Sequence, residues 1–334
     1  MADQLGVGVV GLGFVGAGAH LHAFRTLKQA NLVAVCDLNE DTLEKRAKRH
    51  NVLAKYTDYE KMLQDPAVDA VVVSVPTDHH ARITIAALQA GKHVICEMPF
   101  ASTSDEVDQM LEAAQASGKI LMPSLNFRFT PNYVKAKQLI DAGELGTPKA
   151  IMYREWIPAA DLAAQWPPGS WVWNLEKTGG PLFTLAVWSI DLMRWLTNSD
   201  FEEIDPICQH FPIEKLGGTL GYNAYVNYKF PGGVVGNLQT SGAVAHSCST
   251  SILEVIGDNT RSIKANWNNE LTLFGEDPDR QHWQFREHGG HRMWGHMQMD
   301  GHFCDCVLEG RQPAILPEDG KRAVDVALKI VGRT

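Results

Sequence analysis

The stretch VGVVGLGFVG, Val7–Gly16, decides the fold of the first part of this 334-residue chain. A short apolar run leads directly into the pattern Gly-Leu-Gly-Phe-Val-Gly, and a helical segment comes next. In such a loop the first glycine makes the tight turn, the second lets the backbone approach a pyrophosphate, and the third lets helix pack on strand. Amide groups at a helix start also favour an anion. We therefore predict that a dinucleotide contacts the loop at Gly11, Gly13, Phe14 and Val15.

A second apolar run supports that prediction. LVAVCD, Leu32–Asp37, ends in an acid at about the place where a carboxylate meets the adenosine ribose hydroxyls. Because a carboxylate there repels a 2′-phosphate, we predict that Asp37 selects NAD(H) over NADP(H). The alternative is a glycine-rich turn followed by a surface aspartate. Strand, loop, helix, strand and acid in this order make that alternative the weaker interpretation.

The first 125 residues alternate apolar runs with segments of helical period. We expect strands at 6–11, 32–36, 70–75, 94–96 and 120–124, with a short one near Tyr56. We expect helices at 42–50, 81–90 and 104–117, the last of them capped by Ser104. Alternation of strand and helix predicts an α/β fold with a doubly wound parallel sheet, a Rossmann domain over residues 1–125.

Strand patterns dominate the rest of the chain, which we assign to a second domain over residues 126–334. Several runs alternate apolar with polar residues, which is typical of an antiparallel sheet with one face in water. We therefore predict an α/β domain with a large, mostly antiparallel open sheet. The expected strands are 150–157, 221–230, 233–242, 251–258, 261–267 and 270–275, and the expected helices are 131–142, 181–196, 296–308 and 320–331.

Composition excludes several kinds of partner. The net charge is −9 and no basic run occurs, which argues against nucleic acid and against an anionic membrane surface. No apolar run has the length of a membrane helix, and we expect no signal peptide. The six scattered cysteines favour a reducing, cytoplasmic location. No metal site is predicted, because zinc-ligand spacing is absent from the one stretch rich in suitable residues: His288, His291, His296, His302, Cys304 and Cys306.

Three further stretches carry a resemblance to a known family. They are SVPTDHHARITIAALQAGKHVICEMPFA (74–101), NFRFTPNY (126–133) and EGRQPAILPEDGKRAVDVALKI (309–330). With the glycine loop they resemble the Gfo/Idh/MocA oxidoreductases over nearly the whole chain. The resemblance implies a nicotinamide cofactor, a sugar-like or cyclitol-like substrate, and a homo-oligomer, dimer or tetramer, formed through the outer face of the open sheet. It also implies contacts to the cofactor from Ser74, Pro76, Thr77, His80, Glu97, Met98 and Asn126, with Glu97 beside the nicotinamide ribose.

The catalytic positions depart from the family pattern. The family usually has Glu-Lys-Pro where this chain has Glu97-Met98-Pro99. In the segment TGGPLFTLAVWSID (178–191), Thr184 stands where the family has an aspartate and Trp188 where it has a histidine, while Asp191 is kept. Three replaced positions on one wall of a pocket indicate that the usual proton chemistry has been lost or has moved.

Other residues are candidates for the missing role. Lys177 is the nearest lysine by sequence to the depleted positions and is our first candidate for a catalytic residue. His79, Tyr153 and Glu155 follow it. Each of the four is individually more often a surface or sheet residue, and general acid–base groups typically contribute roughly 10²–10⁴-fold to a rate.

The expected substrate pocket is built from the second domain. A segment rich in tryptophan, with Trp166, Trp171 and Trp173, precedes the pocket helix and offers rings that stack on a sugar. The alternative is that these rings fill a domain junction. Arg128 either clamps a ligand or tethers the domains. The predicted pocket residues are Arg128, Tyr153, Trp173, Thr184 and Trp188.

Three functions remain open from the sequence. The first is an NAD-dependent oxidoreductase that acts on a sugar or cyclitol hydroxyl or ketone with an atypical set of proton-transfer groups. The second is a catalytically inactive NAD-binding regulatory or scaffold protein. The third is an NAD-dependent lyase or glycosidase that oxidises its substrate transiently.

Overall fold

The computed structural model describes residues 4–333 apart from 267–268, 277 and 286–294. The chain forms two compact units, Met1–Asn126 with Trp294–Val324 and Phe127–Met293 with Asp325–Thr334. The chain therefore returns to the first unit late in the sequence. This differs from the expected uninterrupted domain over 126–334, because helix α10 (His296–Glu309) packs on helix α1 (Leu21–Thr26) of the first unit.

The first unit contains a parallel sheet of six strands in the order β3-β2-β1-β4-β5-β6. This order confirms the predicted Rossmann sheet, whose strand order reverses between β1 and β4. Strands β1 and β4 are buried at every residue, which explains their continuous apolar sequence. The strands are β1 Leu5–Val10, β2 Ala30–Cys36, β3 Ala54–Tyr56, β4 Ala70–Val73, β5 His93–Cys96 and β6 Leu121–Pro123.

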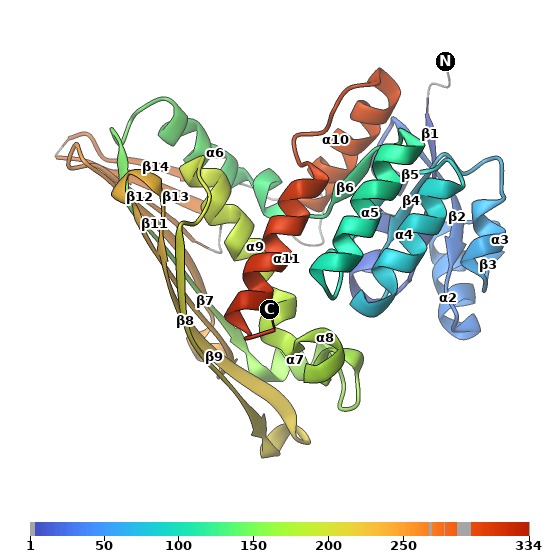
Figure 1. Cartoon of the computed structure of the whole chain (residues 1–334). Helices are drawn as coiled ribbons and strands as arrows, with labels where there is room; N and C mark the ends of the chain where they lie inside the picture. Colours follow the sequence, from blue (N-terminus) through green and yellow to red (C-terminus); the bar gives the residue numbers. More distant parts are fainter. Residues whose placement is uncertain (1–3, 267–268, 277, 286–294, 334) are drawn as a thin grey trace. The chain divides into compact units, whose positions relative to one another are not determined.

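Helices connect these strands, and Figure 1 shows α4 and α5 side by side against the sheet. The predicted Ser104 cap is wrong by one residue. Thr103 is the N-cap. Its backbone is extended, as a cap requires, and its side chain accepts a hydrogen bond from the Glu106 N–H. The helical segments are η1 Gly16–His20, α1, α2 Glu40–His50, α3 Tyr59–Leu63, η2 Thr77–His79, α4 His80–Gln89, α5 Ser104–Ser117 and α10.

The second unit contains an eight-stranded sheet in the order β14-β13-β12-β11-β7-β10-β9-β8. All neighbouring pairs are antiparallel except β7 with β10, which confirms the predicted mostly antiparallel sheet. The strands are β7 Pro148–Pro158, β8 Glu203–Ile213, β9 Thr219–Lys229, β10 Val235–Val244, β11 Thr250–Gly257, β12 Ser262–Asn266, β13 Glu270–Phe274 and β14 Gln281–Gln284.

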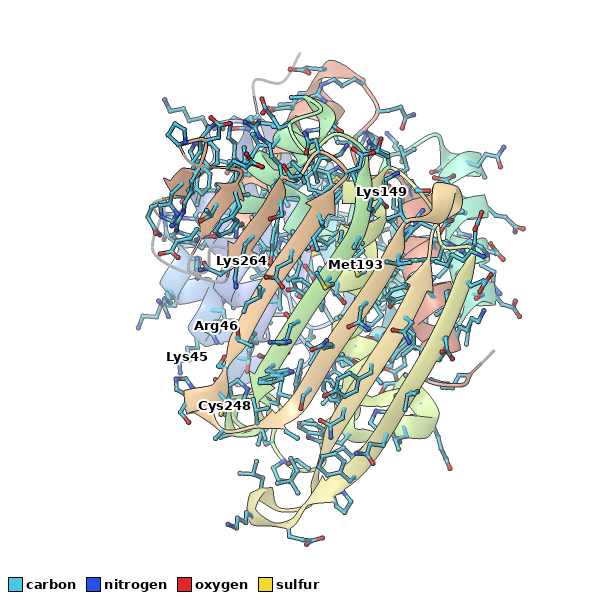
Figure 2. All side chains as sticks on the ribbon, turned by 90° about the vertical axis from the view of Figure 1, so that its left-hand side faces the viewer. Lys45, Arg46, Lys149, Met193, Cys248 and Lys264 are labelled. Carbon is cyan, nitrogen blue, oxygen red and sulfur yellow. The ribbon has the colours of Figure 1, made fainter. Side chains whose placement is uncertain are left out.

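Helices of the second unit lie on one face of this sheet, as Figure 1 shows for α6 and α9. Figure 2 looks onto the opposite face, where side chains such as Lys264 project from the strands and no described helix of this unit crosses them. The helical segments are η3 Asn126–Phe129, α6 Pro131–Asp141, α7 Ala159–Gln165, η4 Trp171–Trp173, α8 Leu175–Thr178, α9 Gly180–Thr197, η5 Glu214–Leu216, η6 Pro231–Gly233, η7 His246–Cys248 and the end of α11 Pro317–Ile330.

Strands β8 and β14 and helices α3 and α7 are among the elements that the sequence did not predict. Strand β8 contains Pro206 and Pro212, which are typical strand breakers, but β8 is the last strand of its sheet. A proline is tolerated there because an edge strand has a side that needs no hydrogen-bond donor. Helix α7 lies between a predicted strand and a predicted helix, where no element is predicted, and its alanines favour the helix strongly. None of the helices among the described residues is long and apolar enough to cross a membrane.

Candidate functional site

The glycine loop has the geometry that its sequence predicts. Gly11 has a φ of +90°, and a Cβ there would lie 2.1 Å from the carbonyl oxygen of Ser74. A Cβ on Gly16 would lie 2.0 Å from the carbonyl oxygen of Gly11, so helix and strand approach each other only because this side chain is absent. A Cβ on Gly13 would meet no atom of the described residues within 4 Å. The space beside Gly13 therefore fits the close approach of a pyrophosphate to the backbone.

Asp37 follows β2 and contacts this loop. Its carboxylate accepts hydrogen bonds from the Leu12 N–H at 2.8 Å and from the Asn39 N–H at 2.9 Å. Each oxygen accepts one bond, so each keeps a lone pair for a ribose hydroxyl. The position at the carboxyl end of β2 agrees with the predicted adenosine contact, and the hydrogen bond to Leu12 adds a structural role.

The turn after β4 carries four predicted cofactor residues: Ser74, Pro76, Thr77 and His80. Thr77 and His80 are buried. The His80 ring nitrogens lie 2.8 Å from the carbonyl oxygens of Pro99 and Val75, which ties this turn to the segment after β5. Burial lowers the pKa of His80. The structure thus gives His80 a supporting position, while direct contact with a cofactor stays a prediction.

Glu97 and Met98 follow β5, at the carboxyl edge of the parallel sheet. Both are 5% exposed, and Asn126, at the end of the first unit, is 1% exposed. Glu97 Oε1 accepts a hydrogen bond from the Ser124 hydroxyl at 2.5 Å. A methionine carries no proton, so Glu97 is the titratable group at this strand end.

The partners of Glu97 come from distant parts of the sequence, and no sequence pattern predicts them. His20 Nε2 lies 2.8 Å from Glu97 Oε1, and His20 Nδ1 lies 2.9 Å from Asp300 Oδ2. His296 Nε2 lies 3.7 Å from Glu97 Oε1. Burial works against a charge on His20, but Asp300 and Glu97 outweigh it and raise the pKa of His20 to about 10. Burial likewise opposes ionisation of Glu97, but the two histidines hold its pKa well below the usual range. The one sequence signal was a histidine four residues beyond the glycine pattern.

This cluster is also the one group among the described residues that could hold a metal ion. Ligand atoms of His20, Glu97 and His296 lie within 4.8 Å of one another. Two ligands about 2.05 Å from a tetrahedral zinc ion lie roughly 3.3 Å apart. The 2.8 Å between His20 and Glu97 is instead the distance of a direct hydrogen bond. The geometry favours a proton over a metal ion between them. His288 and His291 lie outside the described residues.

In the second unit, the guanidinium group of Arg128 is paired with the carboxylate of Asp191. Its Nε and Nη2 atoms donate to the two oxygens of Asp191 on α9, which is 1% exposed. Thr184 is 3% exposed and donates to the carbonyl oxygen of Gly180 within the same helix. The half-buried Trp188 packs its ring 6.3 Å from that of Phe127. Arg128 therefore ties the start of this unit to α9, and its contact with a substrate stays a prediction.

A buried polar cluster lies on the helix-covered face of the large sheet. Tyr153 Oη donates to Glu155 Oε1 at 3.3 Å and lies 2.9 Å from the Ser251 hydroxyl. Tyr133 on α6 hydrogen-bonds with both Ser251 and Tyr153. Glu155 is 7% exposed, and its burial raises its pKa to about 7 although the Tyr153 hydroxyl opposes this. A carboxyl group that titrates near neutral pH is suited to proton transfer.

The remaining candidates are less enclosed. Lys177 is exposed on the short helix α8, and His79 is half-buried in η2. The tryptophans of 166–173 contact one another. The Trp173 indole N–H donates to the carbonyl oxygens of Trp166 and Pro167 at 3.0 and 3.1 Å, and the rings of Trp166 and Trp173 meet edge to face at 6.4 Å. The segment is therefore held together by its own aromatic contacts.

Together, the strand order, the glycine loop and the acid after β2 define a dinucleotide-binding protein of the Rossmann class. Family models agree with this assignment. One described as "Oxidoreductase family, NAD-binding Rossmann fold" matches residues 5–125, and one described as the Gfo/Idh/MocA C-terminal domain matches residues 133–262. The chain belongs to the Gfo/Idh/MocA oxidoreductase family, and its first unit is the NAD-binding domain.

Individual relatives extend the similarity over almost the whole chain. A myo-inositol 2-dehydrogenase of Thermotoga maritima is 27% identical over 95% of this chain and 92% of its own. The crystal structure of a probable dehydrogenase from Thermotoga maritima shares 26% identity with a TM-score of 0.81, covering 98% of this chain and 97% of that one. A levoglucosan dehydrogenase, solved in complex with NADH and L-sorbose, has the same fold with a TM-score of 0.85 and 23% identity, covering 99% and 97%.

Proposed function

We propose that this protein is an NAD-dependent oxidoreductase that interconverts a hydroxyl and a ketone on a sugar or cyclitol. NAD(H) supplies the hydride acceptor or donor, and the first unit has the loop that fits its pyrophosphate. The substrate class follows from the relative named myo-inositol 2-dehydrogenase. The observation that carries the proposal is a complete dinucleotide loop in a chain whose family models include both domains of the oxidoreductase.

We infer that the proton-transfer group differs from the family pattern, since the resemblance puts Met98, Thr184 and Trp188 at the usual catalytic positions. Two residues are candidates. Glu155 titrates near neutral pH because it is buried, and Lys177 carries an amine on α8. Burial favours Glu155, because it raises the pKa toward the working pH, where general acid–base catalysis is most efficient.

The test is turnover measured on a panel of inositols, inososes, aldoses and anhydrosugars. Reduction of NAD+ should appear as absorbance of the reduced nicotinamide. Glu155→Gln should lower kcat by roughly 10²-fold or more with the Kd for NADH unchanged, while Lys177→Ala should leave kcat nearly intact. The reverse order of effects would transfer the role to Lys177. Full activity in both variants would exclude both residues.

The three replaced positions favour a second candidate, a protein that binds NAD(H) without turnover. This candidate predicts tight NADH binding and no absorbance change with any member of the panel. The two functions are therefore separated by the same assay, provided that NADH binding is measured independently by quenching of tryptophan fluorescence.

Self-association through the uncovered face of the large sheet is part of the proposal. The exposed apolar side chains on that face are Ile207, Tyr225, Val235 and Ile256, with exposed fractions of 70%, 51%, 56% and 43%. Cross-strand pairing of Ile207 with Tyr225 places them on one side of the sheet. We also propose a cytoplasmic location, supported by six cysteines that are all free thiols.

A further inference from the structure

Three ionisable side chains form a continuous buried chain in the first unit. Asp300 contacts His20, and His20 contacts Glu97, at distances of 2.9 and 2.8 Å. The exposed fractions are 0% for Asp300, 0% for His20 and 5% for Glu97. Buried charges persist only when they are paired and hydrogen-bonded, so the three groups depend on one another.

The geometry fixes the proton arrangement of His20. Each ring nitrogen faces a carboxylate oxygen, and an ionised carboxylate only accepts hydrogen bonds. Both nitrogens must therefore carry a proton, which makes His20 an imidazolium ion. Its positive charge lies between two negative charges and offsets the cost of burying them.

Two local features bring the three groups together. The segment GAGAH, Gly16–His20, forms a π-helical turn, which contains one residue more than an α turn. The extra residue rotates the later residues of the helix by about 100° relative to a regular helix and sets the direction of His20. On α10, Gly301 lets the helix approach α1, because a Cβ there would lie 3.2 Å from the Leu27 side chain. Asp300, its neighbour, can then reach His20.

The two oxygens of Glu97 have different surroundings. Oε1 is hydrogen-bonded to His20 and Ser124 and faces His296. Oε2 lies 3.3 Å from the Met98 N–H, a long hydrogen bond that leaves lone pairs for another donor. Glu97 stands at the carboxyl end of β5, next to β4 and the point where the strand order reverses. Ligands of such sheets bind outside the strand ends at that point.

We propose that Asp300 and His20 are positioning residues that hold Glu97 ionised and oriented, so that Glu97 Oε2 accepts a hydrogen bond from a hydroxyl group of the bound coenzyme. The proposal rests on NAD(H) binding by the first unit. Asp300 and His20 themselves need not touch the coenzyme. Through Asp300, a helix from the end of the sequence completes the cofactor unit.

Two substitutions at His20 separate positioning from packing. In His20→Gln the side-chain N–H takes the place of Nε2 and can still donate to Glu97. In His20→Asn the side-chain N–H takes the place of Nδ1 instead and can donate a hydrogen bond only to Asp300. We expect the Kd for NADH to stay within about threefold of wild type for His20→Gln and to rise by roughly tenfold or more for His20→Asn, the effect of losing one charge-assisted hydrogen bond. The melting temperature should fall by several degrees in both, since each loses the buried cation.

The control is Lys321→Ala, which breaks an exposed ion pair with Asp108 in the same unit. It should change neither the Kd nor the melting temperature appreciably. Equal weakening of NADH binding by both His20 variants would make His20 a packing residue and overturn the proposal. A stoichiometric divalent metal in the wild type, lost in both variants, would overturn it too, because His20 would then be a ligand. Failure of the wild type to bind NADH would instead contradict the proposed function itself.

Discussion

Arg128 donates hydrogen bonds to both carboxylate oxygens of Asp191, from Nε at 2.8 Å and from Nη2 at 2.5 Å. Both side chains are largely buried, with exposed fractions of 10% and 1%.

Asp191→Asn should lower the free energy of unfolding of the second unit by about 3 kcal/mol, because it leaves a buried guanidinium without its counter-ion. Urea denaturation followed by tryptophan fluorescence measures this. The exposed pair of Lys264 with Glu254 in the same unit is the control, and Lys264→Ala should cost less than about 1 kcal/mol. A similarly small loss of unfolding free energy in both variants would mean that the buried pair stabilises the protein no more than the exposed pair does.

Glu155 makes stability depend on pH. Its pKa in the folded protein, about 7, lies above the ordinary value of 4.5, so the folded state binds more protons than the unfolded state between these values. Stability should fall as pH rises through that window and level off above it. Glu155→Gln removes the titration. Relative to wild type, the variant should gain about 2 kcal/mol between about pH 5 and about pH 8 in chemical denaturation. A difference that does not change with pH would show that Glu155 titrates normally.

The glycine loop offers a matched pair of substitutions. The Cβ of Gly13→Ala would contact no atom in the part of the chain that the structure describes, whereas the Cβ of Gly16→Ala would lie 2.0 Å from a backbone oxygen. We expect Gly13→Ala to keep the wild-type melting temperature and to weaken NADH binding by roughly tenfold or more, because the methyl group occupies the space of the pyrophosphate. Gly16→Ala should lower the melting temperature. Unaltered NADH affinity in Gly13→Ala would contradict the assigned pyrophosphate position.

Coenzyme choice should depend on Asp37. The wild type should bind NADH more tightly than NADPH, because the carboxylate repels a 2′-phosphate. Asp37→Asn keeps an oxygen that can accept from the Leu12 N–H and removes the charge. The ratio of the two dissociation constants, measured by fluorescence titration, should therefore shrink by roughly tenfold. Tighter binding of NADPH by the wild type would contradict the assignment.

The uncovered sheet face should control the oligomeric state. Tyr225→Lys places a charge among exposed apolar side chains and should shift the wild-type oligomer toward monomer, as light scattering coupled to gel filtration would show. Leu53→Lys is the matched control, because Leu53 is 89% exposed on the first unit and should have no effect on assembly. A monomeric wild type would remove the proposed interface.

Local sequence was sufficient for several short-range patterns. The glycine loop, the acid after β2 and the buried strands β1 and β4 were predicted because each depends on neighbouring residues and on strand periodicity. The position of Glu97 at a strand end followed from the same pattern. Strand β8 was missed because its two prolines oppose a strand locally, and only its edge position makes them acceptable.

The partners of Glu97 lay beyond local patterns. His20 and Asp300 are 280 residues apart in sequence and meet only because α10 packs on α1. Likewise, Glu155 is an ordinary strand residue in the sequence, and its pKa is raised because the fold buries it beside Tyr153 and Ser251. Such electrostatic effects depend on burial and on the distance between groups, and both are set by the tertiary fold and not by the order of residues.

The sequence by itself determined the Rossmann architecture, the glycine loop and the side chains that stand at Met98, Thr184 and Trp188, because glycine spacing, strand period and residue identity are properties of the chain. Tertiary structure alone decided that His20 carries a charge, that Arg128 grips Asp191, and that a buried Glu155 titrates near neutral pH. These three properties depend on which distant groups are buried side by side, because the exclusion of water by burial sets the strength of the interaction between charges.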